Sequence, residues 1–302
     1  MWFLITIIGY FLLAAVLVLD KLILTKSVGK PVVYTFYSTV FLLAAFLAWP
    51  FGVVLPSGID IVWAMVSGVG FGFGMWTLFI AVKAGEASHI NPFIGGVITI
   101  ATYIFSFLLL GEQLTSAQVA GVMVMSFATL LLSFEKSKTH HGFHTGFLWG
   151  IASGIIFAVS HVAAKHMYEH YDFLTGLVWT RGTAGFFGLA LLFFPSVNRA
   201  LFGKKPKKKV KGYAKRHATG IVVANKVLSV IGIILVHYGI SIGSVTLVNA
   251  LAGVEYAFMF IMIFLCTKFL PKVFKEYFTK RELAVEVIAI ALIALGSMFF
   301  VL

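Results

Sequence analysis

Three charged side chains lie within long apolar stretches of this 302-residue chain. Glu255 is the only charge in VNALAGVEYAFMFIMIFL, which spans residues 248–265, and Arg181 and Lys226 interrupt two other apolar stretches. In hydrocarbon, a charge at a helix centre costs ~2.5–3.5 kcal/mol, so such groups should face one another or a water-filled cavity. These three residues are therefore the first candidates for a functional site.

The helical rise puts the three charges at similar depths. Glu255 lies about eleven residues, or ~16 Å, from one end of its apolar stretch, and Lys226 lies about seven residues, or ~11 Å, from the opposite end of its own. Measured from that opposite side, Glu255 lies at a depth of ~14 Å and Arg181 at a depth of ~18 Å in a hydrocarbon core ~30 Å thick. We expect them to converge, either as a structural ion pair or triad or as a substrate or proton site.

Two polar residues extend this candidate site. Ser229 falls on the same helical stripe as Lys226 and His237. His161 lies in another apolar stretch, where a histidine can relay protons, although a hydrogen-bonded packing histidine is an equal alternative. Two cations against one carboxylate favour an anionic or zwitterionic substrate.

The composition places these residues in a membrane. The chain is 60% hydrophobic and 11% charged, with a mean hydropathy of +1.01, whereas soluble domains average ~25% charged residues. Several apolar blocks approach the ~20 residues that a spanning helix needs, and they lack the alternation of a membrane barrel. We predict an all-α polytopic membrane protein. The single cysteine, Cys266, excludes an intrachain disulfide.

Ten transmembrane helices are predicted, joined by connections of Gly, Pro, Ser, Lys and His that are mostly short. Residues 2–19 have no basic segment before them and no cleavage site, so they are expected to be a retained first span. The predicted helices cover residues 2–19, 31–54, 61–82, 90–110, 116–134, 146–164, 173–194, 219–238, 244–265 and 283–302.

The basic residues predict the orientation. Twenty of the 23 Lys and Arg residues lie in the loops after the odd-numbered helices, and the loops on the other side hold one, Lys165. By the positive-inside rule the odd loops are cytoplasmic, and both termini face outward from the cell membrane. The densest patch, KKPKKKVKGYAKR (Lys204–Arg216), is interpreted as a topology anchor, with contact to anionic lipid as an alternative. Nucleic-acid binding is not predicted.

Two segments of the chain share one motif. EQLTSAQVA and EYFTKRELA carry Thr-x-x-Gln and Thr-x-x-Glu pairs in capping-box form, so each is expected to begin the last helix of its half. The acidic residue three positions before each threonine is assigned a structural role in the preceding turn. The matched residues are Glu112, Thr115 and Gln118 in the first half and Glu276, Thr279 and Glu282 in the second.

The motif divides the chain into two repeats of five helices. The first repeat covers residues 1–135 and the second residues 146–302, with a cytoplasmic linker at 136–145. Because five is odd, the second copy must be inverted relative to the first. Inverted repeats are typical of secondary transporters, which bind substrate between the repeats near the bilayer midplane.

The first-half segment AVKAGEASHINPFIGGVITIATYIFSFLLLGEQLTSAQVAGVMVMSFATLLL resembles an EamA domain of the drug/metabolite transporter superfamily. Leu110, Gly111, Glu112, Gln118 and Gly121 fit the family pattern, while the second half is more weakly similar, with VFKE in place of Leu-Gly-Glu. The resemblance covers the whole chain as two EamA repeats. It implies a ten-helix exporter or exchanger with a central cavity, and it specifies no substrate.

The predicted function is therefore alternating-access transport of a small metabolite or amphipathic solute, by a monomer or homodimer without a cofactor. In this preferred interpretation the protein is not an enzyme. The alternative interpretation is a membrane-embedded enzyme or flippase that acts on a lipid-linked substrate. No metal site is predicted, because HHGFH at residues 140–144 has no carboxylate nearby. GVGFGFG at residues 68–74 lies within a span and follows no strand, so we interpret it as close helix packing.

Overall fold

The computed structural model describes residues 1–23, 30–84, 87–133, 145–203, 214–269 and 279–301, apart from the side chains of residues 20–23, 87–88, 214–223 and 282. All regular elements in these ranges are helices. Nine described stretches are long and apolar enough to cross a membrane, and a further apolar helix, Leu283–Met298, is shorter. The prediction of an all-helical protein with the long apolar helices of a polytopic membrane protein is confirmed.

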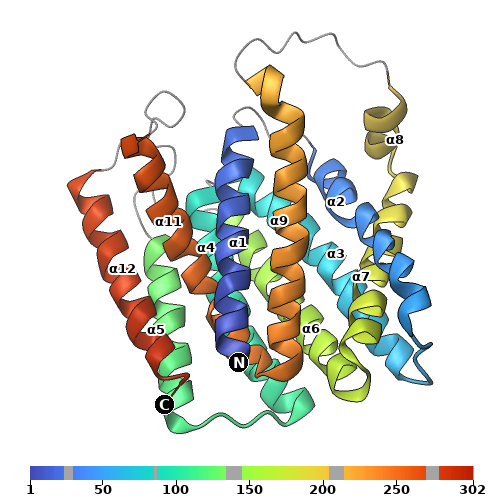
Figure 1. The fold of residues 1–302 in the computed structure, drawn as a ribbon, viewed down its shortest axis with the longest axis horizontal. Helices are drawn as coiled ribbons and strands as arrows, with labels where there is room; N and C mark the ends of the chain where they lie inside the picture. Colours follow the sequence, from blue (N-terminus) through green and yellow to red (C-terminus); the bar gives the residue numbers. More distant parts are fainter. Residues whose placement is uncertain (24–29, 85–86, 134–144, 204–213, 270–278, 302) are drawn as a thin grey trace.

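The helices form one bundle, with both ends of the chain at the same end of it (Figure 1). Each predicted extent overlaps one helix or two consecutive ones. The helices are α1 (Trp2–Ile23), α2 (Pro31–Thr39), η1 (Val40–Phe51), α3 (Asp60–Ala84), α4 (Ala87–Leu110), α5 (Ser116–Ser133), α6 (Thr145–His170), α7 (Phe173–Ala190), η2 (Leu191–Phe193), α8 (Pro195–Phe202), α9 (Ala214–Ile242), α10 (Val245–Ala250), α11 (Ala252–Phe269) and α12 (Lys280–Met298).

Two details of the predicted organisation were wrong. The stretch after residue 194 was expected to be a loop, but it contains α8, which has Pro195 in its first turn and a fully buried Val197. Proline suits this position because its missing N–H would have no partner in a first turn. In addition, α6 continues to His170, so Lys165 lies within a helix and not in a loop.

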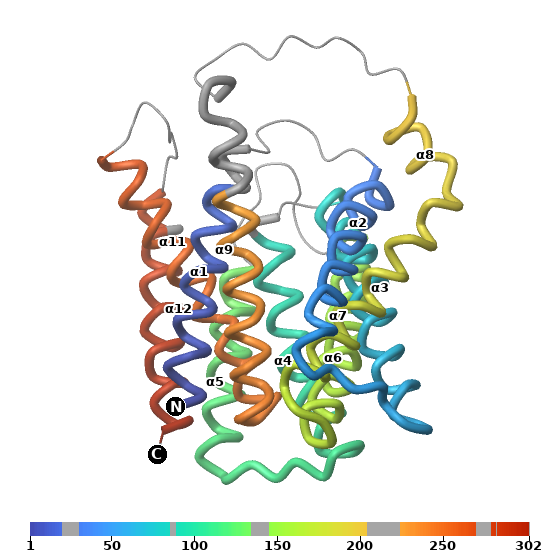
Figure 2. The backbone as a smooth tube through the Cα atoms, turned by 45° about the vertical axis from the view of Figure 1, so that its right-hand side comes forward, coloured from blue at the N-terminus to red at the C-terminus, as the bar shows by residue number. Residues whose placement is uncertain are grey.

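Helices α4 and α6 pack against each other at the centre of the bundle. Figure 2 shows α1, α5, α9, α11 and α12 on one side of this pair, and Figure 1 shows α2, α3, α7 and α8 on the other. The most extensive pairings are α3 with α6 and α1 with α9, and α5 also packs against α12.

The second predicted helix contains a long 3-10 segment. The chain is α-helical to Thr39 and then continues as η1 for 12 residues. A 3-10 helix has three residues per turn, so every third side chain of η1 lies on one line. That line meets three glycines of α7 with the same spacing. The facing pairs are Val40 with Gly188, Leu43 with Gly185 and Phe46 with Gly182.

The glycines at residues 68–74 allow close helix packing, as predicted. A methyl group at Gly68 would collide with the backbone of α7 at Ala184. At Gly72 it would collide with the Phe187 ring of the same helix. These positions draw α3 against α7, since any larger side chain would hold the two helices apart.

The capping box of the first half is confirmed. The backbone nitrogen of Thr115 donates to Gln118 Oε1 at 3.0 Å, and the backbone nitrogen of Gln118 donates to Thr115 Oγ1 at 3.2 Å. Glu112 accepts a hydrogen bond from Thr246 Oγ1 at 2.5 Å, which ties the turn before α5 to α10. In the second half, the Thr279 carbonyl accepts from the Leu283 nitrogen at 3.0 Å.

Several other predicted features lie outside the described residues. They are Glu276, the side chain of Glu282, the linker residues up to 144 with the HHGFH segment, and most of the basic patch Lys204–Arg216, of which only the backbone of 214–216 is described.

Candidate functional site

Arg181 lies at the centre of the bundle, in the part of α7 that packs against α3. Its side chain is 4% exposed, and its guanidinium carbon lies 4.5 Å from the centre of the Phe71 ring of α3. This cation–π contact partly stabilises the charge. However, Nε and Nη2 of Arg181 have no hydrogen-bond partner in the described part of the chain. Arg181 is therefore a buried cation with free donors.

Two histidines and a tyrosine surround this cation. Arg181 lies close enough to His161, His237 and Tyr168 to interact electrostatically with each. The Tyr168 hydroxyl and His237 Nδ1 are 2.9 Å apart, and the rings of His161 and His237 are 6.2 Å apart. The site thus collects polar groups from α6, α7 and α9.

Asn249 completes this group from the side of α10. It lies beside His161, and its Nδ2 donates to Thr102 Oγ1 of α4 at 3.3 Å. The backbone carbonyl of Asn249 accepts from Thr99 Oγ1, also at 3.3 Å. The helix breaks two residues later, at Leu251, between α10 and α11. Interrupted helices next to buried polar groups are a common feature of transporter substrate sites.

We call Arg181, His161, His237, Tyr168 and Asn249 the central polar cluster. It contains a guanidinium, two imidazoles, a phenol and an amide, and no carboxylate. Nδ1 of His161 also has no hydrogen-bond partner in the described chain. An unmade hydrogen bond to a buried donor costs about 1–3 kcal/mol. An anionic ligand would supply both the missing charge and the missing acceptors.

Glu255 is not part of this cluster. It lies in the first turn of α11, is partly buried, and interacts electrostatically with Tyr10 and Tyr256. The Tyr10 hydroxyl donates to the Val248 carbonyl at 3.0 Å, and the Tyr256 hydroxyl donates to the Asn91 carbonyl at 2.8 Å. These two tyrosines hold α1 and α4 close to the turn that carries the carboxylate.

The predicted convergence of Glu255 with Lys226 and Arg181 as an ion pair or triad was wrong. Within the described chain, no ion pair joins any two of the three residues. Helix α1 packs against both α9 and α11, so it separates Lys226 from Glu255. Equal depth in the membrane did not bring them together, because depth says nothing about position around the bundle.

Lys226 and Ser229 lie on α9 away from the central polar cluster. Lys226 is exposed and Ser229 is partly buried. Asn225, which directly precedes Lys226, is buried, and its Nδ2 donates to the Val16 carbonyl of α1 at 3.1 Å. Of the predicted stripe, His237 reaches the cluster. Helices α6 and α7 contact α9 only sparsely, which leaves much of its remaining surface uncovered.

Three members of the cluster were not among the predicted site residues. Tyr168 lies beyond the expected end of its helix at residue 164, and Asn249 belongs to a stretch in which only the charge was weighed. His237 was noted on its stripe but not chosen. A search for every polar side chain within extended apolar helices would have found all three.

Lys165 has a structural position. Its Nζ donates to the Gly243 carbonyl at 2.8 Å and the Ser241 carbonyl at 3.4 Å, and it lies 3.6 Å from Glu169. A cation at these carbonyls complements the negative end of the α9 dipole. Among the described residues, no group of three or more His, Cys, Asp or Glu side chains is placed to hold a metal ion.

The fold resembles that of solved structures. One of them, described only as "Crystal structure of protein", matches with a TM-score of 0.65 and 21% identity, covering 99% of this chain and 95% of that chain. It is one of 29 matching chains. No family model and no curated protein matches. At this identity the similarity shows that nearly the whole chain shares a fold with a solved structure.

Proposed function

We propose that this protein is a secondary transporter that binds an anionic or zwitterionic small solute at Arg181. The observation that carries the proposal is the buried guanidinium, whose Nε and Nη2 lack partners and which is paired with no carboxylate in the described chain. A buried charge without a counter-ion is unfavourable, so the site gains stability when an anion enters it. The imidazoles and the Asn249 amide would orient the rest of the solute.

The packing supports two inverted repeats of five spans. If each span corresponds to the one five places later, the α1–α9 pairing corresponds to α6–α3, and the α1–α11 pairing to α6–α4. The α5–α12 and η1–α7 pairings each join corresponding spans. All these pairings are present, as the proposed ten-span, EamA-like architecture requires. In such proteins the substrate site lies between the repeats.

One pair of contacts departs from this symmetry, which supports alternating access. Helix α3 packs extensively against α7 and against α2. The corresponding helix α9 contacts α7 sparsely and has no comparable packing against α2 in the described chain. A transporter with one gate closed and the other open has this asymmetry, because equivalent contacts form on one side at a time.

Polar contacts reinforce the closed side at the end of the bundle that holds the termini. Asp60 at the start of α3 lies 3.1 Å from His166 of α6 and accepts from the Tyr171 hydroxyl at 2.8 Å. The Trp63 ring stacks on His166 with centres 4.5 Å apart. In the proposed topology this is the outer end, so the structure would correspond to an inward-open state.

The topology can be tested with fusions to the carboxyl terminus. With both termini outside, alkaline phosphatase fused there should be active and green fluorescent protein should be dark. The physical reason is the concentration of Lys and Arg in the odd loops. The reverse pattern would contradict the proposed orientation.

The substrate class can be tested by thermal unfolding of detergent-purified protein. Carboxylates, phosphate esters and zwitterionic amino acids should be screened against amines of similar size. We expect at least one anion or zwitterion to raise the unfolding midpoint and then to exchange across proteoliposomes with saturable kinetics. Stabilisation by cations alone would contradict the proposal, as would lipid scrambling without solute exchange.

Arg181 should carry this effect. Arg181→Gln should lower transport of the identified solute at least 100-fold and remove its stabilising effect, because the counter-charge is lost, whereas Arg181→Lys should retain part of both. Lys226→Gln is the matched control, since Lys226 is an exposed cation on α9, and it should change transport less than threefold. Equal losses in the two Gln variants would contradict a specific role for Arg181.

Glu255 provides a separate test of proton coupling. The carboxylate lies one turn after the break between α10 and α11 and pairs with no cation in the described chain. If it is the coupling group, Glu255→Gln should retain solute exchange but abolish the response of uptake to an imposed pH gradient. An unchanged response would restrict Glu255 to a structural role.

A further inference from the structure

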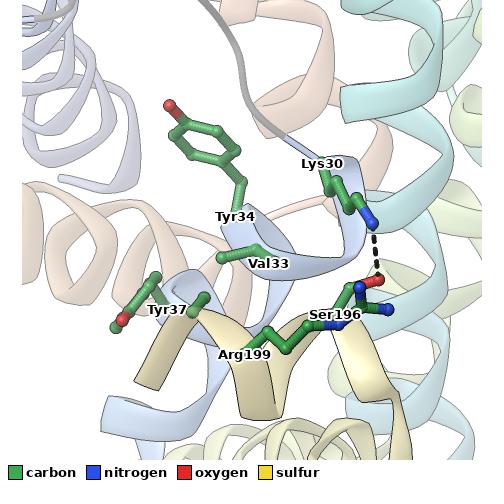
Figure 3. Close-up of a pocket in the computed structure, with 7 residues that line it drawn as sticks. Lys30, Val33, Tyr34, Tyr37, Ser196 and Arg199 are labelled. Carbon is green, nitrogen blue, oxygen red and sulfur yellow. Dashed lines mark hydrogen bonds between the residues drawn. The ribbon is translucent and has the colours of Figure 1, made fainter. Parts of the chain in front are cut away.

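A cavity of about 500 Å³ lies between the start of α2 and helix α8. Figure 3 shows Lys30 and Arg199 extending toward Ser196, with Tyr34 and Tyr37 on the other side of α2. The cavity lies at the end of the bundle opposite the termini (Figure 1), and no residue of the central polar cluster lines it. Its lining includes Lys30, Val33, Tyr34, Tyr37, Ser196 and Arg199.

The lining of this cavity is cationic. Lys30 Nζ donates to Ser196 Oγ at 3.3 Å, and Arg199 Nε donates to the Pro195 carbonyl at 3.3 Å. Neither cation forms an ion pair with any described carboxylate, and no acidic residue is among the lining. A lysine, an arginine and a hydroxyl form a typical recognition set for a phosphate group.

Both walls of the cavity are anchored by buried apolar contacts. Val197 of α8 is fully buried, and it belongs to the same apolar cluster as Val32 and Phe36 of α2. Lys30 and Arg199 are therefore carried by two elements fixed to each other, and little backbone ordering is needed when a ligand binds.

The surroundings of α8 indicate that the phosphate belongs to a lipid. Phe193, two residues before α8, and Phe202, the last residue of α8, are 88% and 83% exposed. A short helix with exposed aromatic residues at its ends and an arginine between them is suited to the interface, where aromatics enter the acyl region and the cation stays at the headgroups. Tyr34 and Tyr37 offer an aromatic wall of the kind enriched at that level.

We infer that the cavity between α2 and α8 binds the phosphate of an anionic phospholipid headgroup, with Lys30 and Arg199 as its counter-charges and Ser196 as a hydrogen-bond donor. Bound lipid would link the start of α2 to α8. This inference is independent of the solute bound at Arg181.

The test is a titration of delipidated protein with phosphatidylglycerol, followed by native mass spectrometry in detergent. The variant Lys30→Gln/Arg199→Gln should weaken binding at least fivefold, whereas Arg199→Lys, which keeps the charge, should bind within about twofold of the original. The matched control is Lys83→Gln/Lys268→Gln. It removes two exposed lysines from the ends of α3 and α11 and should leave the affinity unchanged.

Other outcomes would overturn the inference. Equal weakening in the two double variants would show attraction by overall charge. Equal affinity for phosphatidylcholine would show that the anionic headgroup is not recognised. Competition by glycerol 3-phosphate or inorganic phosphate at similar concentrations would assign the cavity to a soluble phosphate. Ser196→Ala leaves both cations in place, so its expected two- to threefold loss tests the cavity even if the double variant folds poorly.

Discussion

Helices α3 and α9 hold corresponding places in the proposed repeats, yet they are packed differently. Helix α3 lies between α6 and α7 and also touches α2, whereas α9 is held mainly by α1. Gly68 and Gly72 bring α3 against α7. Val227 and Val230 of α9 are 52% and 56% exposed, and Val62 and Met65 of α3 are 49% and 51% exposed, so the two helices differ in their neighbours and not in how much of them is buried. In the proposed transporter, a seam between α3 and α7 that has no counterpart at α9 would correspond to one closed gate and one open gate.

The difference follows from side-chain size at the seam. On α3, glycines leave room for Phe187 and for the backbone at Ala184. The Thr183 hydroxyl is shared between the Ala64 carbonyl of α3 at 2.8 Å and the Trp179 carbonyl of its own helix at 2.7 Å. Close backbone approach thus gives the closed side a polar contact as well as dispersion contacts. If α9 closed against α7 in the alternate state, these contacts would be released as others formed.

Breaking the closed seam should have the largest effect. Gly72→Leu places a branched side chain where even a methyl group would collide with the Phe187 ring. We therefore expect the free energy of unfolding to fall by about 3 kcal/mol, with a lower thermal-unfolding midpoint in detergent. Gly70→Ala is the control, because its added carbon would lie 3.3 Å from Ser160 Cβ, and it should cost less than about 1 kcal/mol. Equal midpoints would mean that the seam is not tightly packed.

Cysteine labelling should sharpen the contrast between the two sides. In a Cys266→Ser background, Lys226→Cys should react with a membrane-impermeant maleimide at least ten times faster than Thr183→Cys. Lys226 is exposed on α9, while Thr183 is 7% exposed within the α3–α7 seam. Similar rates would show that this part of α9 is as enclosed as the α3–α7 seam.

Removing the polar contact of the seam should have a smaller effect. Thr183→Val keeps the side-chain shape but deletes the hydroxyl that is shared between the Ala64 carbonyl of α3 and the Trp179 carbonyl of α7, which should lower the free energy of unfolding by about 1 kcal/mol. Thr77→Val is the control on the same side, since its hydroxyl bonds within α3 to the Phe73 carbonyl at 2.9 Å. Equal shifts of the unfolding midpoint in the two variants would indicate that the contact between the helices adds nothing.

The smallest effect is expected at the start of α7, the helix that forms the seam. The Asp172 carboxylate caps α7 by accepting from the Thr175 nitrogen at 3.0 Å. Burial alone would raise the pKa of Asp172, but hydrogen bonds from Thr175 and nearby backbone nitrogens outweigh it and hold the pKa below its usual value. Asp172→Ala should therefore cost about 0.5–1 kcal/mol.

The pH dependence of this variant tests the origin of the loss. A lowered carboxyl pKa stabilises the fold above the unfolded value of ~3.9, and that contribution disappears as pH falls through the folded pKa. The difference in unfolding midpoint between the original protein and Asp172→Ala should therefore shrink below about pH 4. Asp172→Asn, which still caps, should reduce that dependence. A difference that stays constant with pH would contradict a role for the charge.

Much of the helical arrangement was predictable because apolar length and capping chemistry are local properties. The Thr115–Gln118 capping box and the packing glycines at residues 68–74 both follow from near neighbours in sequence. The 3-10 geometry of η1 does not, because it depends on the distant glycines of α7. Helix α8 was missed because its stabilising contact, Val197, reaches residues far away in the chain.

The candidate site was predicted only in part. Arg181 and His161 lie in the central polar cluster, but the expected ion pair with Glu255 does not form. Helical rise gives the depth of a residue, whereas its direction depends on which neighbouring helix stands beside it. Here α1 stands between α9 and α11, and no local pattern in the sequence indicates that.

The 3-10 segment η1 makes the second span longer than an α-helix of the same residues would be. Twelve residues at about 2.0 Å each extend ~24 Å, whereas the same residues in an α-helix would extend ~18 Å. A change between the two geometries would move one end of the span by ~6 Å along its axis without breaking it. Because η1 meets the α7 glycines at every third residue, a change to 3.6 residues per turn would take its side chains out of line with those glycines. The length of the second span is therefore tied to its packing against α7.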